Sequence, residues 1–145
     1  MLTFAQLTYG QSVVVDTSVW VSSLLANDRN HVQASTWLNN HFMSNGLVVA
    51  SLLLVVEAGA AVVRATQDTA LAHNIVSQLQ VLPAVRLAIL DQQLIAEAAN
   101  IAITYRIRGA DSIYVALAAQ LGLPLVTFDH EQLTLPTSII TTIRP

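Results

Sequence analysis

The stretch VVVDTSVW at residues 13–20 contains the pattern that decides the fold. Val13–Val15 is a run of β-branched residues, which is typical of a strand buried on both faces of a sheet. Asp16 follows where this strand ends, and Thr17 and Ser18 add side chains that can cap a helix. The stretch therefore predicts a buried strand that leads directly into a helix, with a carboxylate at the junction.

The alternation of short apolar strands with helices continues along the whole chain. It is typical of an α/β fold, in which helices flank a parallel sheet. No linker, repeat or low-complexity tract interrupts it, and 145 residues fit a single domain, 1–145. Further strands are expected at 47–50, 87–90, 125–128 and 139–143, and further helices at 31–43, 52–65, 69–80, 92–105 and 112–121.

The composition limits the possible functions. Apolar residues make up 54% of the chain and charged residues 10%, which excludes a disordered protein. There is no cysteine, so disulfides, zinc–thiolate sites and cysteine nucleophiles are excluded. All six basic residues are arginines, and the net charge is −3. Binding of a polyanion through bulk electrostatics is therefore not expected, and bound cations or a partner would have to supply positive charge.

Neither the amino-terminal sequence nor the longest apolar run predicts contact with a membrane. The start of the chain, MLTFAQLTYGQ, lacks the basic region of a signal peptide. The apolar run at 47–63 approaches the length of a membrane span, but Glu57 interrupts it. We interpret this run as a buried strand followed by a buried helix, and we expect a cytoplasmic protein.

Four of the nine acidic residues lie in the most apolar parts of the chain, where a carboxylate is usually paired or coordinated. In parallel α/β folds, sites form beyond the carboxyl ends of the strands. Two of the four acids directly follow predicted strands, so we expect them at the same edge of the sheet. The four candidates are Asp16, Glu57, Asp111 and Asp129.

A cluster of such carboxylates would favour a bound cation. Two carboxylates about 4 Å apart repel each other by roughly 4 kcal/mol at an effective dielectric near 20. The cluster must therefore take up protons or bind a cation, because few basic residues lie nearby. Hard oxygen ligands select Mg²⁺, Mn²⁺ or Ca²⁺. Metals held in this way can activate water and orient a phosphodiester, so the pattern indicates phosphoryl chemistry.

Each of these acids also has a purely structural interpretation. Asp16, Asp111 and Asp129 precede possible helices and could be helix N-caps. Gln132, three residues after Asp129, would complete a capping box with it. Glu57 should lie in the middle of a helix, where facing solvent is its alternative. A cap position remains compatible with metal binding, because it places the carboxylate at the edge of the sheet.

Hydroxyl and arginine side chains close to the acids are further candidates. Ser18 and Thr127 could orient a carboxylate, or make only local cap and turn bonds. Arg106 and Arg108 precede Asp111 and could contact RNA phosphates, or be simply solvated.

The combined pattern resembles a PIN domain, and most of all the VapC-type toxins of prokaryotic toxin–antitoxin pairs. The resemblance rests on VVVDTSVWV, on the glutamate within SLLLVVEAGAAVVR and on RGADSIYVALAAQLGLPLVTFD, and it spans residues 13–131. It implies a single three-layer domain with a parallel β-sheet flanked by helices. Many relatives carry more basic charge than this chain.

The resemblance also implies a function and assigns residues to it. Asp16, Glu57, Asp111 and Asp129 match the catalytic, metal-binding acids of the family, and Ser18 and Thr127 match its supporting hydroxyls. The implied reaction is Mg²⁺- or Mn²⁺-dependent hydrolysis of RNA phosphodiesters, which leaves 5′-phosphate and 3′-hydroxyl ends. A homodimer and a cognate antitoxin protein are the implied partners.

Two alternatives to a ribonuclease remain open. One is a non-catalytic binding module with the PIN fold, and the other is a DNA-directed nuclease with the same acidic site. Receiver domains and haloacid-dehalogenase-type phosphatases resemble the layout too. Both need a lysine near the phosphate, and this chain has none.

Overall fold

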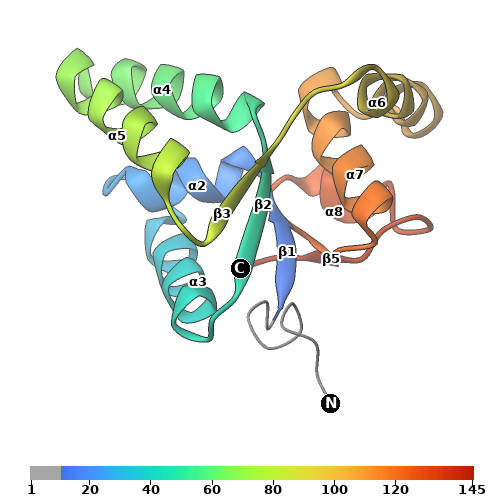
Figure 1. Ribbon diagram of the computed structural model, residues 1–145, viewed down its shortest axis with the longest axis horizontal. Coiled ribbons are helices and arrows are strands. Elements are labelled where there is room, and N and C mark those ends of the chain that lie inside the picture. Colours follow the sequence, from blue (N-terminus) through green and yellow to red (C-terminus); the bar gives the residue numbers. More distant parts are fainter. Residues whose placement is uncertain (1–10) are drawn as a thin grey trace.

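A five-stranded parallel sheet with the strand order β3-β2-β1-β4-β5 runs through the centre of the protein. The computed structural model describes residues 11–145 (Figure 1). Residues 1–10 lie outside the described part, and with them nearly all of the segment in which no signal peptide is expected. The strands are β1 (Ser12–Val15), β2 (Leu47–Ser51), β3 (Val85–Ala88), β4 (Leu125–Val126) and β5 (Thr142–Ile143).

Helices cover both faces of this sheet, as the sequence predicts. Figure 1 shows α2, α3, α4 and α5 on one side and α6, α7 and α8 on the other. The three-layer architecture, a parallel sheet flanked by helices, is therefore confirmed. The helices are α2 (Thr17–Leu24), α3 (His31–Met43), α4 (Leu53–Thr66), α5 (Thr69–Val81), α6 (Gln92–Tyr105), α7 (Gly109–Leu121) and α8 (His130–Thr134).

The core forms where the apolar strands meet the helices. Val14, Val48 and Leu125 lie on three adjacent strands and are fully buried. Burial of one such side chain contributes about 1.5–3 kcal/mol to folding. Because both faces of these strands are covered, the continuous apolar runs that predicted them are required by the fold.

The register of β1 and β4 determines where the site lies. Val15 pairs with Val126, so the carboxyl ends of these two central strands coincide. The backbone N–H of Asp16 donates to the carbonyl oxygen of Val126 over 3.0 Å. Asp16 and the residues that follow β4 therefore meet at one edge of the sheet.

Several element boundaries differ from the prediction. The third strand is Val85–Ala88 and not 87–90, because its register with β2 begins at Val85, and Ile89 is largely exposed. The fifth strand is only Thr142–Ile143. The fourth strand ends at Val126 instead of 128. Beyond it, the N–H groups of residues 128 and 129 donate to side-chain hydroxyls instead of a neighbouring strand.

The start of α7 corrects the N-cap interpretation of Asp111. The helix begins at Gly109, earlier than the predicted 112, and the N–H of Ser112 already donates to the carbonyl of Arg108. Asp111 therefore lies in the first turn of the helix, where its negative charge interacts favourably with the helix dipole. Within residues 11–145, no helix is long and apolar enough to cross a membrane.

Candidate active site

Asp16 is both a helix cap and a buried carboxylate at the centre of the site. Its side chain begins α2 by accepting a hydrogen bond from the N–H of Ser18, 3.0 Å from Oδ2. The other oxygen, Oδ1, accepts from Nε2 of Gln132 over 3.2 Å. Only 4% of the residue is exposed. The cap interpretation is therefore correct, but it does not account for the second bond or for the burial.

Glu57 lies in the middle of α4, half-buried, and is held by a chain of two hydroxyls. Thr17 Oγ1 donates to Glu57 Oε1 over 2.9 Å, and the hydroxyl of Tyr114 lies 2.6 Å from Thr17 Oγ1. Since threonine has one hydroxyl proton, Tyr114 donates to Thr17. Burial raises the pKa of Glu57, the Thr17 bond opposes this, and the charge of Asp16 adds to it. Glu57 therefore does not simply face solvent.

Asp111 and Asp129 are joined by the guanidinium group of Arg108. Arg108 Nε lies 2.9 Å from Asp111 Oδ2, and Arg108 Nη2 lies 2.7 Å from Asp129 Oδ2. Asp129 also caps α8 by accepting from the N–H of Gln132. Burial, followed by the charges of Asp16 and Asp129, raises the pKa of Asp111 to about 6, although Arg108 opposes the rise. The two carboxylates in turn raise the pKa of Arg108 above its usual value.

The structure thus brings the four predicted acids to one edge of the sheet, where their charges link them in pairs. The charge of Asp16 raises the pKa of both Glu57 and Asp111, and the charge of Asp129 raises the pKa of Asp111. Among residues 11–145, however, no three acidic or histidine side chains converge closely enough to hold a metal ion. Arg108 lies across two of the acids. The all-oxygen donor set and the mutual repulsion still fit a hard divalent cation.

The two supporting hydroxyls act mainly on the turn that carries Asp129. Ser18 Oγ accepts from the N–H of Phe128 over 3.2 Å. Thr127 Oγ1 accepts from the N–H of Asp129 over 2.9 Å and lies 3.4 Å from Asp16 Oδ2. Thr127 therefore makes the local turn bond of the structural interpretation, whereas the Ser18 bond joins residues 110 positions apart. Both bonds hold the turn that carries a predicted metal-site residue.

The two candidate arginines have different surroundings. Arg106 ends α6 in the left-handed conformation, with φ of 57°. Arg108 is not simply solvated, because its guanidinium lies on Asp111 and Asp129 although its side chain is 71% exposed. Contact of either arginine with RNA stays a prediction.

Sequence reasoning missed three polar residues that support the acids. Thr17 and Tyr114 hold Glu57, and Gln132 contacts Asp16. Tyr114 is three residues after Asp111, so both side chains lie on one face of α7, which is a usable signal. The sequence indicates a role for Gln132 only in capping α8.

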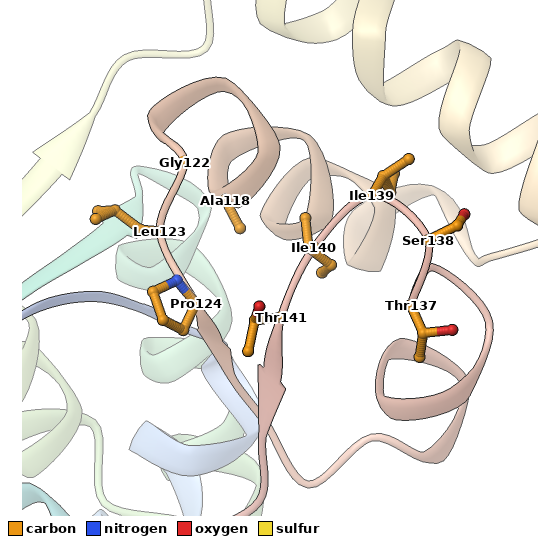
Figure 2. Close-up of a pocket in the computed structure, with 9 residues that line it drawn as sticks. All are labelled: Ala118, Gly122, Leu123, Pro124, Thr137, Ser138, Ile139, Ile140 and Thr141. Atoms are coloured by element: carbon orange, nitrogen blue, oxygen red, sulfur yellow. The ribbon is translucent and has the colours of Figure 1, made fainter.

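Two surface depressions differ in their relation to the acids. A groove of about 450 Å³ next to Glu57 is lined by Thr17, Ser18, Val21, Val56, Glu57, Ala60, Ala61 and Arg64. Figure 2 shows another pocket, of about 370 Å³, between the end of α7, Pro124 and residues 137–141. Its lining contains no acid, and Pro124 precedes β4, so this pocket lies at the opposite end of the strand from Asp129. Only the groove adjoins the candidate site.

Comparison with known proteins gives one family and one fold. A family model for the PIN domain matches residues 13–136. Among solved structures, the sarcin-ricin-loop-cleaving toxin VapC20 of Mycobacterium tuberculosis is 19% identical, with TM-score 0.73 over 92% of this chain and 99% of that chain. FitAcB from Neisseria gonorrhoeae is 20% identical, with TM-score 0.66 and coverage of 90% and 96%.

A toxin–antitoxin complex from Klebsiella pneumoniae also matches, at 15% identity and TM-score 0.64, with 90% of this chain and 95% of that chain covered. No curated protein matches the sequence. At these identities the solved structures establish the fold.

Proposed function

The chain belongs to the PIN domain family, and we propose that it is a metal-dependent endoribonuclease, the toxin of a toxin–antitoxin pair. One observation carries the proposal. Four carboxylates from separate elements lie near the carboxyl edge of the sheet, where the charge of Asp16 helps to raise the pKa of both Glu57 and Asp111, and the charge of Asp129 adds to that of Asp111. Such a cluster is costly unless it serves to bind a cation.

Each acid has a role in this proposal. Asp16 and Asp129 are the direct ligands of the metal, and Glu57 and Asp111 complete the site or order water. When bound, Mg²⁺ or Mn²⁺ would supply a Lewis acid that neutralises charge on the phosphodiester and stabilises the leaving oxygen. Glu57 and Asp111 are not direct ligands, so they remain free to accept or donate protons.

Glu57 accepts the proton of the attacking water in this proposal, because Asp111, whose pKa is also raised, is paired with Arg108. Its Oε1 is engaged by Thr17, which leaves Oε2 available. A raised pKa brings a carboxylate closer to the pH at which a general base is most effective. Attack of water at phosphorus then breaks the bond to the 3′ oxygen, and the products carry a 5′-phosphate and a 3′-hydroxyl.

The groove next to Glu57 supports a single strand of RNA as substrate. Its walls include Val21, Val56 and Ala60, which suit the apolar face of an unstacked base. Arg64 lies on the same wall, two helical turns after Glu57, and can contact a backbone phosphate. In a chain with a net charge of −3, such a local contact replaces a broadly basic surface.

The proposal includes protein partners. One solved structure with this fold is described as a toxin–antitoxin complex, which supports a cognate antitoxin for this protein. Large apolar side chains exposed on the surface, among them Val32, Val81 and Ile103, would suit the antitoxin and a second copy of the chain in a homodimer. We place the protein in the cytoplasm, together with its RNA substrate.

The proposal is tested with purified protein freed of any co-expressed partner. Cleavage of structured and unstructured RNA is followed with EDTA, Mg²⁺ or Mn²⁺. Asp16→Asn should lower cleavage at least about 100-fold, because a bound metal supplies several kcal/mol of transition-state stabilisation. Asp91→Asn is the matched control, since Asp91 caps α6 outside the site and asparagine caps equally well.

Two results would redirect the proposal. If no RNA is cleaved and calorimetry detects no metal binding, the protein is a non-catalytic binding module that has kept the fold. If only DNA substrates are cleaved, and cleavage requires both metal and Asp16, the protein is a DNA-directed nuclease.

A further inference from the structure

The side chain of Gln132 contacts three residues of the site, Asp16, Asp111 and Thr127. It is completely buried in α8, and every polar atom of its amide has a partner. Oε1 accepts from the hydroxyl of Thr127 over 2.6 Å. Nε2 lies 3.2 Å from Asp16 Oδ1 and 3.1 Å from the carbonyl oxygen of Asp111. Its backbone N–H donates to Asp129 Oδ1 over 2.9 Å. Gln132 thus contacts the carboxylates of Asp16 and Asp129 and the backbone of Asp111.

Helix capping does not explain this side chain. In a reciprocal capping box, the side chain of Gln132 would return to the N–H of Asp129. That N–H donates to Thr127 Oγ1 instead, over 2.9 Å. The start of α8 therefore uses only the backbone N–H of Gln132, and its side chain is directed into the protein toward Asp16.

Counting protons shows which way the amide faces. Thr127 has one hydroxyl proton, and its oxygen lies 2.6 Å from Gln132 Oε1 but 3.4 Å from Asp16 Oδ2. The shorter contact takes the proton. The two groups on the other side of the amide, Asp16 Oδ1 and the Asp111 carbonyl, can only accept, so the amide nitrogen of Gln132 faces them and both of its hydrogens are used. Gln132 is thus the side-chain donor to Asp16.

We propose that Gln132 is a positioning residue, which fixes the carboxylate of Asp16 and ties it to the backbone of Asp111 at the start of α7. The inference rests on the proposed metal-dependent nuclease, and it adds a residue that the acids alone do not predict. The N–H of Ser18 donates to Asp16 Oδ2, and Gln132 donates to Oδ1. The two donors together hold the carboxylate in one orientation. Partners of this kind raise metal affinity because they orient the ligand in advance.

The test compares Gln132→Met with Leu38→Ala. Methionine keeps the length of the side chain and removes both donors. Leu38 is buried in α3, outside the site, so its alanine variant controls for lost stability. Calorimetric titration with Mn²⁺, at a temperature where all variants are folded, should show 10- to 100-fold weaker binding for Gln132→Met. Leu38→Ala should bind as the wild type does.

A second measurement uses the unaltered protein and does not depend on the stability of a variant. The side-chain amide protons of Gln132 should exchange slowly with solvent in NMR spectra. Their resonances should move on titration with Mg²⁺, because the Asp16 carboxylate that they contact becomes engaged.

The outcomes separate this inference from the proposed function. Wild-type protein that binds no metal would overturn both. Wild-type protein that binds Mn²⁺ while Gln132→Met binds equally well would overturn the role of Gln132 alone. Equal losses in Gln132→Met and Leu38→Ala would also overturn it, because affinity would then follow stability.

Discussion

The guanidinium group of Arg108 donates to the carboxylate of Asp129 over 2.7 Å, although the two residues are 21 positions apart in the chain. Its Nε also donates to Asp111, so the positive charge of Arg108 contacts two residues of the proposed metal site. We predict that Arg108→Gln binds Mn²⁺ about two- to thirtyfold more tightly than the wild type. Exposed ion pairs contribute about 0.2–1 kcal/mol each, and the metal no longer has to displace them.

Arg106→Gln is the control for this prediction. Arg106 has the same charge and is two residues away, but within residues 11–145 the only ion pairs are those of Arg108. Calorimetry at low ionic strength measures both variants. Equal tightening in the two would show a general charge effect, and unchanged affinity in Arg108→Gln would show that the arginine does not compete with the metal.

Asp111 makes the metal-free protein sensitive to pH. The folded-state pKa is about 6, against an ordinary value of 3.8, chiefly because of burial. Folding thus favours the protonated carboxyl group of Asp111. The stabilisation of the folded protein that results is complete below about pH 4 and is lost as the pH rises through 6. At pH 7, Asp111→Asn should stabilise the metal-free protein by about 1–3 kcal/mol while abolishing RNA cleavage.

Thermal unfolding in EDTA between pH 4 and pH 7.5 checks this sign. The difference in melting temperature between Asp111→Asn and the wild type should grow with pH and vanish near pH 4. A variant that is less stable than the wild type at pH 7 would show that the Arg108 pair outweighs the burial of the carboxylate.

The hydroxyl chain that ends at Glu57 predicts a specific order of stabilities. Thr17→Val leaves the buried Tyr114 hydroxyl without its acceptor, which should cost about 1–3 kcal/mol. Tyr114→Phe removes one hydrogen bond and keeps the Thr17 donor to Glu57, so it should cost about 1 kcal/mol. Urea unfolding of both variants and of the double variant measures the coupling. Fully additive losses would contradict the chain.

The sheet and the acids on it could be predicted because they follow from rules that operate over a few residues. Val13–Val15 needs burial on both faces, and a parallel sheet places Asp16 and Asp129 at one edge. Glu57 was recognisable because a carboxylate in an apolar helix demands a partner. These signals are contained in short stretches of sequence.

The supporting contacts could not be predicted, because each joins positions far apart in the chain. Gln132 and Asp16 are 116 residues apart, and Tyr114 and Thr17 are 97 apart. Nothing local distinguishes Gln132 from an ordinary capping residue, and only the packing of α8 turns its amide inward. The placement of Arg108 on the acids likewise depends on how α7 approaches the turn after β4.

Arg64 offers the sharpest test of the RNA path. It lines the same groove as Glu57 and follows it by two helical turns, about 10 Å along α4. We predict that Arg64→Gln weakens binding of single-stranded RNA and lowers the slope of log affinity against log salt by about 0.7, the value for one phosphate contact in a single strand. Binding is measured in the Asp16→Asn background, so that the RNA is not cleaved.

Arg29→Gln removes the same charge from an exposed position outside this groove, so it separates a contact from a change in net charge. It should leave the salt slope close to that of the parent protein, because a solvated arginine releases no counterion from the RNA. If the two variants lose affinity equally, the strand does not follow the groove between α2 and α4. If neither loses affinity while RNA still binds, the strand does not contact Arg64, and the same pair of measurements then tests Arg106 and Arg108.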